Sequence, residues 1–185
     1  MKQDLRRVYQ MKVSLNRAKP PIWRRLLVSS ETDLATLHGI IQIAMGWTDS
    51  HLHQFTVKGK RYGCPDPEWD DGLVSERGIQ IGTLLRKAKQ SMLYEYDFGD
   101  GWEHTITLEK VLSTKDEASP SCVGGRRGCP PEDVGGVYGY MHFLEVYQDT
   151  SHPEHAETVE WAGEYFEPER FDIAEVNRAL ASGHK

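Results

Sequence analysis

The stretch Met92–Leu112, MLYEYDFGDGWEHTITLEKVL, decides the fold because it predicts two strands joined by a tight turn. Apolar and polar residues alternate on both sides of the turn, which is the period-two pattern of a half-buried strand. The Asp100-Gly101 pair between the two runs is a strong hairpin signal. We therefore expect a central hairpin with one apolar face, which carries Met92, Tyr94, Tyr96 and Phe98 from the first strand and Trp102, His104, Ile106 and Leu108 from the second.

Two registers of this hairpin are open, and each gives His104 an acidic neighbour. A two-residue loop at Asp100 and Gly101 places Asp97 opposite His104, whereas a four-residue loop places Glu95 there. Side chains that face each other in such a pair are ~5 Å apart. The pair could bind a metal or move a proton, or it could be an ion pair that keeps a partly buried histidine in a polar position.

The composition is that of a soluble globular protein. The 185 residues are 38% hydrophobic and 27% charged, which suits one α+β domain (1–185) with a proper core. No apolar run approaches the ~20 residues that cross a bilayer. The first ten residues, MKQDLRRVYQ, contain no apolar signal-peptide core. We therefore expect a cytoplasmic protein without a membrane partner.

Charge and cysteine content restrict the partners. Residues 1–131, the sheet-rich part, carry 19 Lys and Arg against 16 Asp and Glu, whereas residues 132–185 carry 3 against 12. The acidic part does not favour nucleic acid, although the first part could present a basic face. Cys64, Cys122 and Cys129 lack a Cys-x-x-Cys spacing, so we expect no disulfide-linked partner, and no standard zinc site fits.

The segments before the hairpin predict two strands and a helix. Residues 8–15 and 22–29 alternate like half-buried strands and are separated by a Pro-Pro turn. Arg24 and Arg25 lie on opposite faces of the second strand; either they contact phosphate or they form a solvated face. Residues 33–45 repeat apolar side chains at helical steps, with Asp33 as a cap and Gly46 as a stop. His38 in this helix is interpreted as structural or exposed.

His51 and His53 share one face of a predicted strand over residues 51–59. Two histidines at this spacing can chelate one metal ion, but they are equally often polar residues at a strand end. Both are metal-ligand candidates, together with Asp97 and His104.

The Gly-rich stretch 122–136, CVGGRRGCPPEDVGG, predicts unusual backbone dihedrals rather than a helix or a long strand. Its acids, Glu132 and Asp133, are candidates for a defined functional position, and Arg126 is a candidate binding residue. The alternative is a structural turn that seats the hairpin. The acidic part that follows predicts three helices, over residues 137–148, 153–163 and 172–182, whose apolar stripes pack on the sheet.

Three motifs occur together in this order: YDFGDGWEH (96–104), GCPPEDVGG (128–136) with YGYMHFL (138–144), and WAGEYFEPERFDIAEVN (161–177). The combination resembles the plasmid pRiA4b ORF-3-like family, whose members are also called transposon-passenger TnpR-like proteins, over about residues 8–180. The positions that match its motifs are Tyr96, Asp97, Gly99, Asp100, Trp102, His104, Cys129, Pro130, Pro131, Glu132, Asp133, Gly135 and Gly136.

This resemblance implies mainly a fold, an α+β domain in which a strongly curved, mostly antiparallel sheet is packed by helices. It carries no settled activity and no particular cofactor. The family's plasmid and transposon associations describe gene neighbourhoods rather than chemistry. Val134 stands where family members often have a second cysteine, which argues against a thiol metal site.

Two functions fit the sequence. The first is a binding module for an unidentified protein or nucleic-acid partner, in which exposed aromatics such as Tyr96 and Trp102 stack on bases or grip a partner. The second is a metal-dependent hydrolase, phosphoesterase-like, whose ligands and base come from an acidic cluster. Its catalytic candidates are Asp97, Asp100, His104, Glu132 and Asp133, with His53 as a further ligand.

Overall fold

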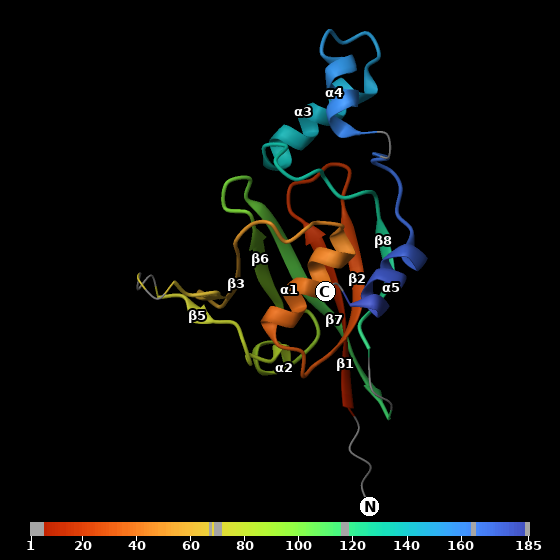
Figure 1. Cartoon of the computed structure of the whole chain (residues 1–185). Coiled ribbons are helices and arrows are strands. Elements are labelled where there is room, and N and C mark those ends of the chain that lie inside the picture. The colour runs from red at the N-terminus through yellow and green to blue at the C-terminus, as the bar shows by residue number, and fades with distance from the viewer. Residues whose placement is uncertain (1–5, 67, 69–71, 116–118, 164–165, 184–185) are drawn as a thin grey trace, which may run out of the picture.

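The computed structural model describes residues 6–66, 68, 72–115, 119–163 and 166–183. It contains eight strands and five helices (Figure 1). In chain order these are β1 (Arg6–Leu15), β2 (Trp23–Ser29), α1 (Leu34–Met45), β3 (His53–Val57), β4 (Lys60–Gly63), β5 (Val74–Ser75), α2 (Ile81–Leu84), β6 (Ser91–Tyr96), β7 (Trp102–Thr114), β8 (Ser121–Arg126), α3 (Gly136–Gln148), α4 (His155–Ala162) and α5 (Ile173–Ser182).

The strands form one mixed sheet in the order β5-β4-β3-β6-β7-β1-β2-β8. Neighbouring strands are antiparallel except β4 and β5, which are parallel. The predicted α+β class is therefore confirmed. Helices α3, α4 and α5 lie within residues 136–182, as the helical periodicity indicated. The expected packing of all three on the sheet is wrong, because α5 lies beside β8 whereas α4 packs against α3 beyond the end of the sheet (Figure 1).

The apolar face of the sheet packs against α1, which lies across it in Figure 1. Residues at alternate positions of β1, β6 and β7 are buried, among them Tyr9, Tyr94 and Ile106. Helix α1 begins as predicted, because Asp33 accepts a hydrogen bond from the Thr36 amide, and it ends at Gly46 in the left-handed region. Among the described residues, no helix combines the length and apolar character that crossing a bilayer demands.

The central hairpin has neither of the two expected registers. Tyr94 faces His104 and Tyr96 faces Trp102, so five residues, Asp97–Gly101, connect the strands. The predicted pairing of His104 with Asp97 or Glu95 is therefore wrong. The reason is local: Asp97 leaves the strand in the left-handed conformation, with φ 57°, and begins a longer turn. His104 is instead fully buried, and its Nδ1 lies 2.8 Å from the carbonyl oxygen of Trp102.

Only the start of the Gly-rich stretch is extended: β8 ends at Arg126 and pairs with β2 at the edge of the sheet. Residues 127–135 form a loop with the expected unusual dihedrals, because Arg127, Asp133 and Gly135 have positive φ. Gly125 is needed in β8 because Phe171 from the segment before α5 lies directly on it. Helix α5 covers the outer edge of β8. Its Asn177 side chain accepts a hydrogen bond from the Cys122 amide at 2.7 Å and donates one to the Cys122 carbonyl at 2.9 Å.

We expect Gly125→Ala to destabilise the protein by about 1–3 kcal/mol, the usual cost of overpacking a close contact. A Cβ atom at this position would lie 2.3 Å from the Phe171 ring. Gly124→Ala is the matched control, because its Cβ would meet Trp23 at an ordinary 3.5 Å. Urea unfolding of both variants checks the prediction, and equal midpoints would contradict it.

Candidate functional site

Three loops meet at one end of the sheet, next to the start of α3. They are the connection from α1 to β3 (residues 46–52), the hairpin turn (97–101) and the Gly-Pro loop (127–135). The Asp97 amide donates to the Leu52 carbonyl at 2.8 Å, which joins the first two loops. The Trp47 indole N–H donates to the Pro130 carbonyl at 3.1 Å, which joins the first and the third. Residues far apart in the sequence are thus held side by side.

Asp97 organises the hairpin turn and also faces the other loops. Its Oδ1 accepts hydrogen bonds from the amides of Gly99 at 2.9 Å and Asp100 at 3.4 Å. This is a local side-chain turn, which tolerates the left-handed backbone of an aspartate. Because Oδ1 is occupied in this way, Oδ2 is the oxygen that faces His51.

Asp100 and Glu132 tie the loops together. Asp100 accepts a hydrogen bond from the Gly135 amide at 3.1 Å. Glu132 accepts one from the Tyr96 hydroxyl at 2.6 Å and another from the Thr48 hydroxyl at 2.5 Å. Burial, and then the neighbouring Glu132, raise the pKa of Tyr96, so that its hydroxyl stays a donor.

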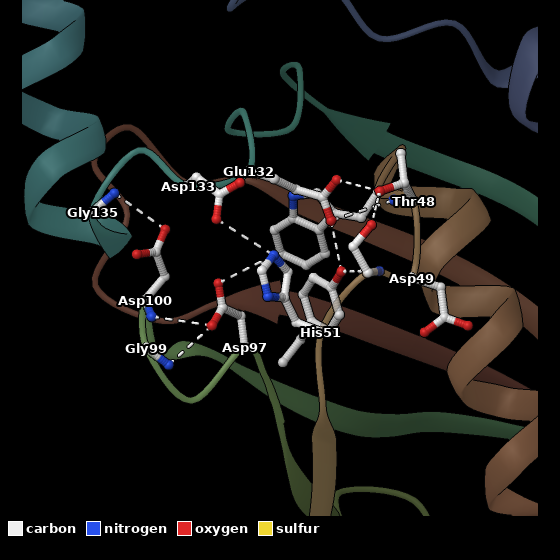
Figure 2. Close-up of polar contacts among 12 residues, drawn as sticks. Thr48, Asp49, His51, Asp97, Gly99, Asp100, Glu132, Asp133 and Gly135 are labelled. Carbon is white, nitrogen blue, oxygen red and sulfur yellow. Dashed lines mark hydrogen bonds and ion pairs between the residues drawn. The ribbon is translucent and has the colours of Figure 1, made fainter.

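His51, Asp97 and Asp133 form what we call the three-loop cluster, because each comes from a different loop (Figure 2). The His51 Nε2 lies 3.7 Å from Asp97 Oδ2 and 3.5 Å from Asp133 Oδ1. One ligand atom from each of the three residues lies within 4.8 Å of the others. The Asp97 side chain is 11% exposed and that of Asp133 is 75% exposed, so the cluster is anchored on one side and open to solvent on the other.

The structure therefore brings together four of the five catalytic candidates, with His51 as their partner. Asp97, Asp100, Glu132 and Asp133 all lie at the meeting of the three loops (Figure 2). His104 does not, because it is buried in the core against Trp47 and Tyr94. Burial lowers the pKa of His104 to about 4, so it is neutral at physiological pH.

Most of the binding candidates offer no surface to a partner. Tyr96 and Trp102 have no exposed surface, so their ring faces are not available for stacking on a base or a partner. Arg24 is 2% exposed and donates to backbone carbonyls. Arg126 is exposed; it is the last residue of the edge strand β8, directly before the Gly-Pro loop. The aromatic face of the sheet is core, as is usual for alternating apolar residues.

The predicted chelation of one ion by His51 and His53 is also not supported by their surroundings. His53 Nε2 lies 2.9 Å from the buried Glu76, and its ring stacks on that of His38 with centroids 3.4 Å apart and planes 4° from parallel. A ligand atom of His53 does lie near those of His38 and Asp49. The lone pair of an imidazole nitrogen, however, lies in the plane of its ring. Two stacked, parallel rings therefore cannot both direct a lone pair at one ion.

His38 belongs to a closed ring of hydrogen bonds that fixes the loop before β3. Its Nδ1 lies 2.8 Å from the Tyr94 hydroxyl and its Nε2 2.6 Å from Asp49. Gln42 donates to the Tyr94 hydroxyl and accepts from the Asp49 amide. The interpretation of His38 as structural fits this ring. Burial is the first of the causes that lower its pKa.

Thr48, Asp49 and Glu76 were not singled out by sequence reasoning. Thr48 contacts Glu132, 84 positions later in the chain, and Glu76 contacts His53 across 23 positions. No spacing rule connects residues at such separations. The one available signal was the polar run TDSH (48–51) between a predicted helix and a predicted strand, because functional side chains gather in such loops.

Comparison with known proteins agrees with this architecture. The family model described as plasmid pRiA4b ORF-3-like protein matches residues 7–175. The uncharacterized protein y4hQ of Sinorhizobium fredii is 38% identical over 175 residues, which are 94% of this chain and 90% of that protein. The crystal structure of MM3350 from Methanosarcina mazei Go1, a protein of unknown function, is 38% identical and superposes with a TM-score of 0.84 over 92% of this chain and 97% of that one. The chain belongs to the plasmid pRiA4b ORF-3-like family.

Proposed function

We propose that this protein is a metal-dependent hydrolase whose divalent ion is held by the three-loop cluster. One observation carries the proposal: a histidine nitrogen and two carboxylate oxygens, from three loops, converge within 4.8 Å. Histidine and carboxylate are the ligands that zinc and similar first-row ions take in catalytic sites with open positions.

The distances fit ligands around an ion better than a hydrogen-bonded pair. N–H···O hydrogen bonds are usually about 2.7–3.2 Å long, whereas His51 Nε2 lies 3.5 and 3.7 Å from the two oxygens. Two ligand atoms bound tetrahedrally at about 2.1 Å from one ion lie roughly 3.4 Å apart. Two carboxylates beside one imidazole also carry more negative charge than a protonated histidine can balance.

The surroundings suit hydrolysis. A divalent ion would polarise a bound carbonyl and lower the pKa of a bound water. Glu132 is the candidate general base, because Tyr96 and Thr48 hold its carboxylate beside the cluster (Figure 2). Within the described residues, no hydrogen bond or ion pair joins Asp97, Glu132 or Asp133 to a lysine or arginine. We therefore favour an uncharged acyl bond as the substrate over a phosphate ester, whose oxygens need cationic partners.

We expect the purified, tag-free protein to bind about one zinc or manganese ion per chain. His51→Ala and Asp133→Asn should each weaken binding by more than tenfold, because even residues that only orient metal ligands contribute about 10–100-fold. Elemental mass spectrometry and calorimetric titration of the chelator-stripped protein measure this. Hydrolysis of a panel of ester and amide substrates should return with the metal and be lost in Glu132→Gln.

His142→Ala is the matched control, since His142 lies on α3 with a 67% exposed side chain and should leave metal binding unchanged. Asp133→Asn is informative because Asp133 is also largely exposed, so the substitution does not disturb the core. Full metal content in both cluster variants, or no ion bound by the stripped wild type, would reject the proposal.

A binding role without chemistry is the second candidate function. It is favoured by the hydrogen bonds that Asp97, Asp100 and Glu132 make within the three loops. These bonds explain why acidic residues stand at the three positions even if no ion binds there. A protein that binds no metal and hydrolyses none of the substrates would favour this function. The buried aromatic face then argues for a protein or small-molecule ligand rather than nucleic acid.

A further inference from the structure

A groove separates the C-terminal half of α1 from the segment 166–179. Its volume is about 910 Å³, within the range of ligand pockets of ~300–1,000 Å³. His51, Asp97 and Asp133 do not line it, so it is distinct from the three-loop cluster. Its apolar walls are formed by Ile43, Met45, Trp47, Phe166, Phe171 and Val176.

Arg24 lines this groove with a buried cation that has no acidic partner in the described part of the chain. Its Nε donates to the Ala44 carbonyl at 2.7 Å, and its Nη1 donates to the carbonyls of Trp23 and Arg126 at 3.0 and 3.1 Å. The centroid of the Phe171 ring lies 4.3 Å from the guanidinium carbon, Cζ, of Arg24. Among the described contacts, the Nη2 atom of Arg24 makes no hydrogen bond. It is not fully buried either, so it keeps some contact with solvent. Nη2 is therefore the part of the guanidinium that a ligand in the groove can reach.

An anion would stabilise a buried guanidinium whose other partners are neutral carbonyls. Arginine is almost never fully buried unless it is paired, because removing a charge from water is unfavourable. Here burial lowers the pKa of Arg24 from its ordinary value, the direction expected for a desolvated cation. A carboxylate in the groove would accept the free N–H groups of Nη2 in a charge-assisted hydrogen bond.

Most of the other charged residues that line the groove have the opposite sign. Its lining includes four carboxylates, those of Asp49, Glu167, Asp172 and Glu175, against one further guanidinium, that of Arg170. The side chains of Glu167, Arg170 and Glu175 are 55–64% exposed and form its solvent side, where the Arg170 guanidinium lies 3.8 Å from the Glu167 carboxylate and 3.2 Å from that of Glu175. One guanidinium is thus shared between two carboxylates. The groove thus has the buried Arg24 cation at its base, apolar walls, and an excess of carboxylates on its solvent side.

We propose that this groove binds a zwitterionic ligand of the amino-acid type, a short apolar peptide with a free C-terminal carboxylate and a cationic N-terminal end. The carboxylate binds Arg24, the apolar side chains lie against Trp47, Phe166 and Val176, and the cationic end faces Glu167 and Glu175. This proposal does not rest on the metal site.

The test uses tripeptides that begin with lysine and end in two apolar residues, in free, C-amidated and N-acetylated forms. Calorimetric titration is carried out with a chelator present, so that a metal ion cannot bind the carboxylate. We expect free tripeptides to bind and C-amidation to weaken binding at least about tenfold, because the buried charged hydrogen bond is lost. Acetylation, which removes one of two positive charges, should weaken it several-fold.

Two variants make the test specific. Arg24→Gln should bind the free and amidated forms equally weakly, and circular dichroism checks that it is folded. Glu175→Lys changes an exposed position of α5 that pairs with Arg170, and it should weaken binding of the cationic ligand several-fold. Circular dichroism checks that this variant is folded as well. Arg178→Gln, at an exposed position of α5 that does not line the groove, should bind like the wild type. Equal affinity of the wild type for free and amidated tripeptides, or no binding of any tripeptide, would overturn the proposal.

Discussion

Acidification from pH 7 to pH 4 should remove about 3 kcal/mol of folding stability through His104 alone. The folded protein holds His104 neutral, with a pKa of about 4, whereas the unfolded chain has the ordinary value of 6.5. Between these two values the unfolded state binds a proton that the native state does not, so stability is complete above pH 6.5 and falls as the pH drops to 4. Each pKa unit corresponds to ~1.4 kcal/mol.

Urea unfolding at a series of pH values measures this loss. His104→Phe is the comparison, because it keeps a ring against Trp47 and Tyr94 but has no proton to bind. The variant is expected to be less stable at pH 7, and its stability should fall less steeply between pH 6.5 and 4. The pKa of His38 is lowered as well. His38 therefore also reduces folding stability as the pH falls, and it does so in both the wild type and the variant. Parallel pH profiles of wild type and variant would show that His104 is not the group responsible.

Gly136→Ala should destabilise the protein by about 3 kcal/mol or more, from left-handed strain and overpacking together. The φ of Gly136 is 70°, and a Cβ atom there would lie 2.2 Å from the carbonyl oxygen of Asp100. A backbone carbonyl cannot rotate away as a long side chain can. The hairpin turn and the start of α3 must therefore separate, and metal binding by the three-loop cluster should weaken with them.

Gly135→Ala separates the two causes. Its φ is 89°, but its Cβ would have only an ordinary contact, 3.7 Å from the Gly139 Cα. It should therefore show the backbone strain alone, about 1–2 kcal/mol. Chemical denaturation and metal titration of both variants check the difference. If Gly135→Ala were as damaging as Gly136→Ala, close approach to Asp100 would not be the reason.

Local patterns in the sequence predicted the longer elements of the sheet and α1, but not the short strands β4, β5 and β8. Alternation located the apolar faces of β1, β6 and β7, and Asp33 with Gly46 bounded α1, because both signals depend on neighbouring residues. The hairpin register was not predictable in the same way. It depends on Asp97 entering the left-handed region, and the Asp100-Gly101 pair favoured a shorter turn. One consequence of that error was the false pairing of His104 with an acid.

The residues of the candidate site could be predicted from the sequence, but their arrangement in space could not. Asp97, Asp100, Glu132 and Asp133 stood out because acids beside glycine and proline occupy defined backbone positions. Their convergence with His51 depends on how three loops dock, through contacts such as Trp47 with Pro130, 83 positions apart. Aromatic alternation, in turn, cannot distinguish a core face from a binding face, and Tyr96 and Trp102 proved to be core.

The amide of Asn177 has a consequence for how copies of this protein behave together. By bonding both backbone groups of Cys122, it takes the position that a ninth strand would occupy at the edge of the sheet. An uncovered edge strand is a template for pairing with another chain and a starting point for aggregation. Helix α5 thus shields this edge of the sheet from intermolecular strand pairing, so that one side chain serves both the fold and its protection from aggregation.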